Sequence, residues 1–160
     1  MISTQAAGAE LALEQSFISE CRFDNKIITL GADAILTNNA EVAVSNLYFN
    51  EDKTKKMGRV RVIVSGDLSV EKHPDIRCDY KMVVEGEFSA AQDKPDEEVQ
   101  KLLWFNGTSI LYGIARAKME VMSSTVFERG KITLPIVNMA EFIKQQNAAY
   151  LKKNDVQTES

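Results

Sequence analysis

The sequence predicts an α+β fold, in which a four-stranded antiparallel sheet has a long helix and a C-terminal helix packed against it. Apolar and polar residues alternate through the first half of the chain, and the turns between these stretches are short. After residue 95, apolar residues instead recur at helical spacing. Short turns favour antiparallel pairing, and strands followed by helices are typical of α+β domains. The expected strands are residues 11–24, 41–50, 60–70 and 76–88.

The first strand and the segment after it have the weakest patterns. Residues 11–24 alternate weakly, and we expect Phe17, Cys21 and Phe23 on one side of the strand. Residues 31–40 are rich in turn formers, so we expect a connection there. The second strand follows this connection.

The remaining strands are clearer. Residues 41–50 form the second strand, and the charged run after it predicts a turn that ends in Met57-Gly58. Valines alternate with polar residues over 60–70, as in a half-buried strand. We expect the next turn at His73-Pro74-Asp75, before the last strand.

Two helices are expected directly after the sheet. Pro95 followed by three acids suits a helix start, because acids complement the positive end of the helix dipole. This short helix should end at the Asn106-Gly107 breaker, and Thr108 or Ser109 should then cap a long helix. Its expected apolar stripe, which must face protein, consists of Ile110, Leu111, Ile114, Ala115, Val121, Met122 and Val126.

The last helix carries an apolar strip close to the end of the chain. Residues 131–135 should be extended, because proline excludes helix interior and β-branched residues favour extended backbone. Helical spacing cannot decide between docking of the strip on the domain's own core and its use as a groove wall. The strip consists of Met139, Phe142, Ile143, Gln146 and Tyr150.

Apolar residues also occur on the sheet face that should be in water. One layer of helices covers only one face of a sheet, so this excess predicts closure by self-association or by a ligand. The residues are Leu47, Phe49, Ile63 and Val83.

Composition predicts one domain over residues 1–160, with loose ends at 1–10 and 154–160. The net charge is −4 and the pI about 5.1, which argues against nucleic acid as a partner. The N-terminus lacks the basic flank of a signal peptide, and the chain has no apolar run long enough to span a membrane. We therefore expect a cytoplasmic protein without membrane insertion.

Catalytic and metal sites are not predicted. His73 is the single histidine and lies in a turn-rich segment, where an exposed histidine is the simpler interpretation. Cys21 and Cys78 are far apart and predict buried thiols rather than a disulfide or metal ligands. An exposed strand face explains Glu85 and Glu87 more simply than a catalytic pair does. We expect no cofactor and no enzyme activity.

Two motifs at a fixed distance resemble the SecB family of bacterial chaperones. The first is Ser109-Ile110-Leu111-Tyr112-Gly113-Ile114-Ala115-Arg116, and the second is Ile132-Thr133-Leu134-Pro135-Ile136-Val137-Asn138-Met139. The family's stretches read roughly N-I-L-F-P-Y-A-R and L-N-L-A-P-V-N-F at the same spacing. Near the N-terminus, Glu20-Cys21-Arg22-Phe23-Asp24 resembles the family's D-I-S-F-E. The likeness covers residues 11–152.

The resemblance implies a homotetramer, a dimer of dimers, that holds unfolded polypeptides without ATP. In the family, clients lie in apolar grooves formed by the connection after the first strand, the second strand and the C-terminal helix. The long helix would mediate tetramer packing. The candidate client-binding residues are Val42, Val44, Leu47, Met139, Phe142, Ile143 and Tyr150.

The resemblance leaves the clients open. Export members dock the translocation motor SecA on acidic residues, for which Glu20, Asp24 and Asp79 are the candidates here. Other SecB-like proteins are dedicated to the antitoxin of a toxin–antitoxin system. A small-ligand-binding protein is the alternative from a different class.

Overall fold

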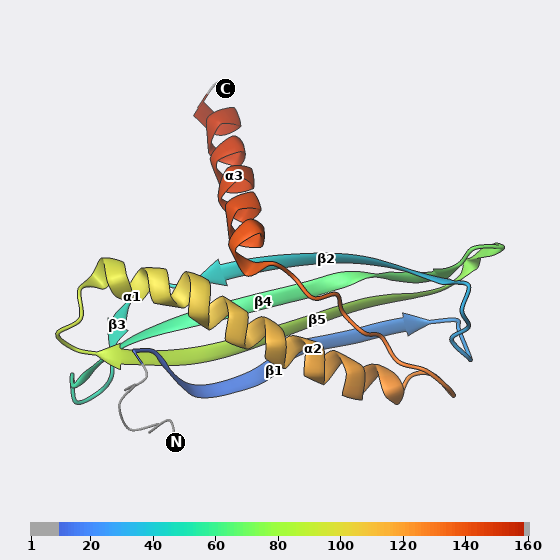
Figure 1. Ribbon diagram of the computed structural model, residues 1–160, viewed down its shortest axis with the longest axis horizontal. Helices are drawn as coiled ribbons and strands as arrows, with labels where there is room; N and C mark the ends of the chain where they lie inside the picture. Colours follow the sequence, from blue (N-terminus) through green and yellow to red (C-terminus); the bar gives the residue numbers. More distant parts are fainter. Residues whose placement is uncertain (1–9, 159–160) are drawn as a thin grey trace, which may run out of the picture.

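The computed structural model describes residues 10–158 of the chain, with side chains up to residue 148. Five strands precede the helices, and Figure 1 shows the long helix lying across one face of the sheet. The predicted α+β class is confirmed, although a fifth, very short strand joins the sheet. The elements are β1 Ala12–Asn25, β2 Ala34–Val44, β3 Tyr48–Phe49, β4 Lys55–Val70, β5 His73–Ala91, α1 Asp96–Leu102, the π-helical segment η1 Leu103–Gly107, α2 Thr108–Ser124 and α3 Met139–Thr158.

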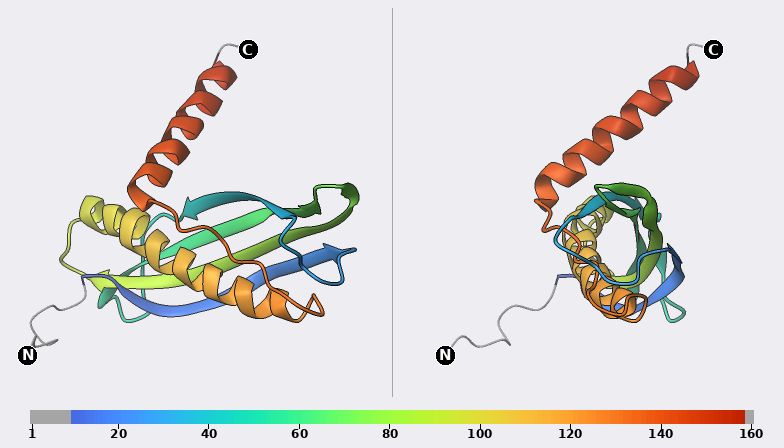
Figure 2. Two further views of the ribbon diagram at one scale, coloured as in Figure 1. Left: turned by 45° about the vertical axis from the view of Figure 1, so that its right-hand side comes forward. Right: turned by 90° about the vertical axis from the view of Figure 1, so that its right-hand side faces the viewer.

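The sheet is antiparallel throughout. Its strands lie in the order β1-β5-β4-β2, and β3 pairs with β4 beyond the end of β2. The long β4–β5 hairpin supplies the buried centre, where Val60, Val62, Val64, Met82 and Val84 are fully buried. In the end-on view of Figure 2, the sheet curls around the layer formed by α2 and the connection that follows it.

The predicted bounds of two central features are wrong. The hairpin turn lies at Glu71 and Lys72, and His73 already begins β5. Met57 and Gly58 do not end a turn but pair within β4, opposite β5. Long-range pairing therefore extends both strands through residues that locally favour turns.

The segment predicted as a connection is largely the second strand. β2 begins at Ala34 and ends at Val44, so residues 34–40 are paired rather than looped. Its polar residues are tolerated because β2 is an edge strand, and because the Tyr80 hydroxyl donates to Asn38 Oδ1 at 2.8 Å. The expected strand 41–50 is interrupted at Ser45, whose Oγ accepts a hydrogen bond from Arg59 N at 2.9 Å.

A bulge in β1 reverses the predicted faces of that strand. The pairing of β1 with β5 shifts register between Ile18 and Glu20. Ile18, Cys21 and Phe23 consequently pack against the core, whereas Phe17 is 49% exposed on the other face. The prediction that Phe17 shares a side with Cys21 is wrong, because one extra residue inverts the alternation.

The helical run does not break at Asn106-Gly107. Residues 96–124 continue from α1 through η1 into α2, and no side chain caps α2. Thr108 is buried, and its hydroxyl donates to Leu103 O at 3.4 Å. Gly107 allows a close approach to the sheet, since a Cβ there would lie 3.1 Å from Val60 Cγ2. The predicted break and the predicted caps are therefore wrong.

The two long helices relate differently to the sheet. α2 buries Leu111, Ala115 and Met119, but Val121 is 66% exposed, so its predicted single stripe lies on two faces. Residues 131–138 form neither helix nor strand and run beside α2, which agrees with the prediction that residues 131–135 are not helical. α3 meets the body only near its beginning and then points away from it (Figure 1). The expected packing of the C-terminal helix is thus limited to its first turns.

Two residues predicted on the outer face of the sheet are less exposed to solvent than their positions suggest. Val83 is fully buried and Ile63 is half-buried on the face that lacks a helix layer. Ion pairs flank them, with Lys81 Nζ 2.9 Å from Glu20 Oε2 and Arg61 Nε 3.7 Å from Glu85 Oε1. Long charged side chains cover apolar surface in this way while keeping their charges in water.

Candidate functional site

An open groove lies between the helical segment before α2 and the first turns of α3. Its volume is about 470 Å³, and we call it the α1–α3 groove. The apolar part of the lining is Trp104, Phe105 and Ile143, and polar residues complete it. Those residues are Asp96, Glu97, Gln100, Lys101 and Asn147.

Contacts to the sheet hold one wall of the α1–α3 groove in place. Lys56 of β4 donates from Nζ to Lys94 O and to Asp96 Oδ1, both at 2.6 Å, and so fixes the start of α1. Gln100 Nε2 donates to Ser45 O at 3.3 Å, which ties the middle of α1 to the loop before β3. This wall is therefore part of the rigid body of the domain.

The π-helical segment supplies the aromatic side chains of the groove. Leu103, at the start of η1, is fully buried and lies against Gly58, where a Cβ would come within 2.4 Å of Leu103 Cδ1. The next two residues then point outward: Trp104 is half-buried and Phe105 is 47% exposed. π-Helical segments are frequent at functional sites, because they redirect side chains within a helix.

The opposite wall is the beginning of α3. Asn138 directly precedes the helix, and its Oδ1 accepts a hydrogen bond from Glu141 N at 3.2 Å. Ile143 is only 4% exposed, so it anchors α3 on the body, and Gln146 Nε2 reaches Ala40 O at 3.5 Å. Met139 and Phe142 are half-buried on the same turns.

The structure brings only some of the predicted client-binding residues to this groove. Ile143 lines it, and Met139 and Phe142 lie on the adjoining turns of α3. Val42, Val44 and Leu47 are half-buried and pack against the core, as Met139 also does. The predicted Tyr150 belongs to α3, but its side chain is outside the described residues.

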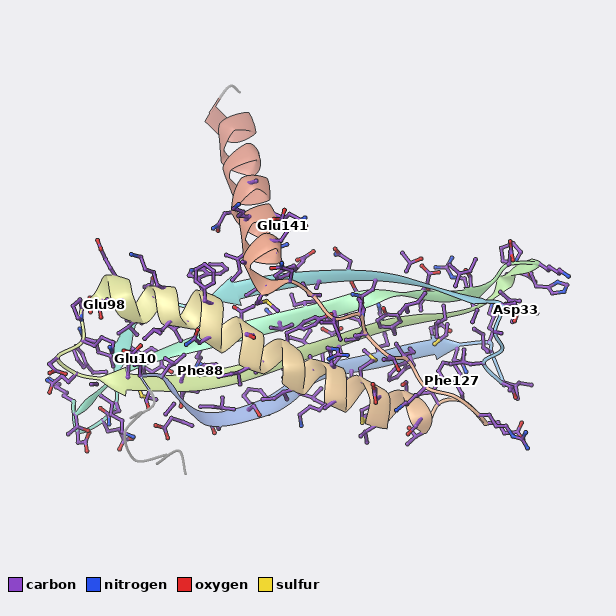
Figure 3. The ribbon with its side chains drawn as sticks, viewed as in Figure 1. Glu10, Asp33, Phe88, Glu98, Phe127 and Glu141 are labelled. Carbon is purple, nitrogen blue, oxygen red and sulfur yellow. The ribbon has the colours of Figure 1, made fainter. Side chains whose placement is uncertain are left out.

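The connection after β1 lies elsewhere. Ile28 O accepts from Glu128 N at 2.8 Å, and Leu30 N donates to Arg129 O at 3.1 Å. The connection is thus attached beyond the end of α2, and Figure 3 labels Asp33 and Phe127 at the end of the molecule away from Glu98. Within one chain it does not contribute to the α1–α3 groove.

Sequence reasoning missed the aromatic wall. Trp104 is the only tryptophan of the chain, and Phe105 follows it directly. The sequence does contain a signal for this wall, which is the pair of adjacent large aromatic residues at the end of a short acidic helix. Neither residue is predicted as part of a site, because the break expected at Asn106-Gly107 conceals the turn that redirects both side chains.

The predicted acidic partner residues share the outer face of the sheet. Asp24 of β1 lies opposite Asp79 of β5, and Asp79 lies opposite Asp67 of β4. Arg77 contacts Asp79 and lies 3.9 Å from Asp67, so part of this acidic row is neutralised. A hydrogen bond from Lys81 lowers the pKa of Glu20.

The titratable groups offer little chemistry. Burial raises the pKa of the Cys78 thiol to about 11, so this thiol stays protonated and is a poor nucleophile at neutral pH. Among residues 10–158, no cluster of three or more histidines, cysteines or carboxylates could hold a metal ion. Within the same residues, no helix has both the length and the apolar content needed to cross a membrane.

Comparisons with known proteins identify a fold. The chain is similar to a SecB-like chaperone of Mycobacterium tuberculosis, Rv1957, whose structure contains a ChAD peptide from the HigA1 antitoxin. The TM-score is 0.59 and the identity 13%, over 81% of this chain and 92% of the other. The chain therefore has a SecB-like fold.

A second solved structure is more distant. It is a Streptococcus agalactiae protein of unknown function, at 15% identity and a TM-score of 0.43 over 79% of this chain and 98% of that one. No protein-family model matches the sequence. No curated protein matches it either.

Proposed function

We propose that this chain is an ATP-independent holdase chaperone that binds non-native polypeptides. The observation that carries the proposal is the α1–α3 groove, where Trp104 and Phe105 leave apolar surface open beside α3. The SecB-like fold supports the same function, because the chaperone of that fold from Mycobacterium tuberculosis was solved with a bound peptide.

Apolar burial is suited to holding many different clients. It contributes about 25 cal/mol per Å² and has no directional requirement, so one surface can bind many sequences. Extended clients can also hydrogen-bond to the free edge of β2, which pairs with β4 on its other side.

A homotetramer, a dimer of dimers, is part of the proposal. Ile110, Gly113, Ala117 and Val121 follow one another at helical spacing on the exposed side of α2. A Cβ at Gly113 would have no atom within 4 Å, so another helix can approach closely there. A second copy of α2 would bury this apolar line in a self-complementary contact.

Two classes of client remain candidates within this function. An antitoxin is supported by the HigA1 antitoxin peptide bound to the Mycobacterium tuberculosis chaperone. Protein export through SecA is supported by the placement of Glu20, Asp24 and Asp79 on one face of the sheet. A pull-down of SecA with wild type and with Glu20→Lys/Asp24→Lys tests the export candidate. Unchanged capture by the double variant would remove these acids from the proposal.

The holdase function is tested by light scattering of a chemically unfolded client, without nucleotide. We expect suppression of aggregation at a several-fold molar excess of the chain, and a loss of suppression in Phe142→Asp and in Phe105→Ser. Ala140→Asp is the matched control, because Ala140 is exposed on the same turn of α3. Aggregation that wild type does not suppress would contradict the proposal.

Binding of a compact small ligand is the second candidate. The groove volume of about 470 Å³ lies within the range of about 300–1,000 Å³ for small-molecule sites. This candidate predicts saturable binding of the ligand and no suppression of aggregation.

A further inference from the structure

The α1–α3 groove has two charged residues of opposite sign that are not used in ion pairs. Asp96 is paired with Lys56, at 2.6 Å between Oδ1 and Nζ. Among the residues with described side chains, Glu97 and Lys101 have no ion-pair partner, and both are exposed. Both line the groove, so an occupant could pair with either of them.

The three main contact points follow one another along the groove wall. Glu97 and Lys101 are separated by four residues, one turn of α1, or about 6 Å along the helix axis. Trp104 lies three residues further, on the same side of the helical run. The wall therefore presents an acid, a base and an aromatic ring in that order.

We propose that the α1–α3 groove binds extended polypeptide segments that carry a cation, an anion and a large apolar residue in this spatial order. The inference rests on the proposed holdase function and names the segments that this site prefers. The segment's cation would pair with Glu97, its anion with Lys101, and its apolar side chain would contact Trp104 and Phe105.

Strand geometry fits this arrangement. Residues i, i+2 and i+4 of an extended chain point to the same side and are spaced by about 6.6 Å, close to one helical turn. The required order of cation, anion and apolar residue is the same whichever way the segment runs along the groove. In either direction, the anion must be nearer than the cation to the apolar residue.

Two peptides of identical composition test the order. One contains Lys-Ser-Glu-Ser-Leu and the other Glu-Ser-Lys-Ser-Leu, within the same Gly-Ser flanks. Trp104 reports binding directly, because it is the only tryptophan of the chain and lines the groove. Titration of the full chain, followed by Trp104 emission, should give tighter binding of the first peptide by about two- to fivefold, as expected for exposed ion pairs.

A charge exchange provides the decisive variant. Glu97→Lys/Lys101→Glu keeps the net charge and should reverse the preference between the two peptides. The matched control is Lys94→Glu/Glu98→Lys, an ion pair outside the groove lining in which Lys94 lies just before α1 and Glu98 lies in its first turn, with Nζ and Oε2 3.7 Å apart. This control should keep the wild-type preference.

Several results would overturn the inference. These are equal affinities for the two peptides in wild type, a reversal in the control variant, or binding without a change of Trp104 emission. Trp104 emission that shifts with protein concentration alone would also overturn it, because a second copy would then fill the groove. Suppression of client aggregation, measured on the same samples, tests the proposed holdase function separately from this inference. If suppression persists without peptide preference, only the inference fails.

Discussion

The two long helices of this protein have similar lengths and very different roles. α2 has 17 residues and buries Leu111, Ala115 and Met119 completely against the sheet. α3 has 20 residues, and Ile143 is the only buried one among those with described side chains. Because helices in proteins gain most of their stability from packing, α2 belongs to the core while α3 depends on its first turns. The proposed site lies beside the less buried helix.

The largest expected effect is on α2. Met119→Ala should lower the free energy of unfolding by about 2–5 kcal/mol, because it removes a fully buried side chain and leaves a cavity. Urea unfolding measures the loss. Ser109→Ala on the same helix is the control and should change stability by less than about 0.5 kcal/mol, since Ser109 is exposed and is not part of the apolar line proposed for tetramer contact. Equal losses in the two variants would mean that α2 is not held by its sheet-facing side.

Truncation of Ile143, which anchors α3 on the body, should affect local stability only. We expect Ile143→Ala to increase hydrogen exchange in the first turns of α3 and to leave exchange in β4 and β5 unchanged, because contacts of α3 with the body are few. Hydrogen exchange followed by mass spectrometry measures both regions. Faster exchange in β5 would show that α3 and the sheet unfold as one unit.

The hydrogen bonds between α2 and the connection should contribute less. The Tyr112 hydroxyl donates to Pro135 O at 2.9 Å, and Arg116 Nε donates to Leu134 O at 3.1 Å. Tyr112→Phe should cost about 0.5–1.5 kcal/mol of unfolding free energy, the usual net value of one hydrogen bond. A double-mutant cycle with Arg116→Met tests whether the two bonds act together. Coupling below experimental error would show that they act independently.

The smallest expected effect is a pH dependence. The hydrogen bond from Lys131 lowers the pKa of Glu120, with 2.6 Å between Nζ and Oε2. The lowered pKa stabilises the fold above the unfolded-state pKa, and this contribution is lost as the pH falls through the folded-state pKa. Glu120→Gln should therefore flatten the acid side of a stability–pH profile. Lys131→Met removes the donor of this hydrogen bond and should flatten the profile in the same way.

Local sequence patterns predicted the elements whose local and long-range preferences agree. The strands over residues 60–70 and 76–88 and the helix start after Pro95 are present, and residues 131–135 form no helix. The errors occur where pairing partners override local preference. β2 begins within a turn-rich segment, and the bulge before Glu20 reverses the faces of β1. A local sequence window contains no information about a partner strand that lies elsewhere in the chain.

The candidate site was predicted only in part, for the same reason. Ile143, Met139 and Phe142 follow from helical spacing, and they lie at or beside the groove. Trp104 and Phe105 were missed because their direction depends on η1. Gly58 and Gly107 also let this segment lie close to the sheet.

The sequence by itself determined the order of strands and helices, because alternation and helical spacing are local properties of the chain. Only the tertiary structure decided which side chains remain open to a partner. A side chain is buried or exposed according to what packs against it, and for Trp104 and Ile143 that neighbour comes from another part of the chain. The groove therefore exists only once α3 stands beside the α1–η1 segment.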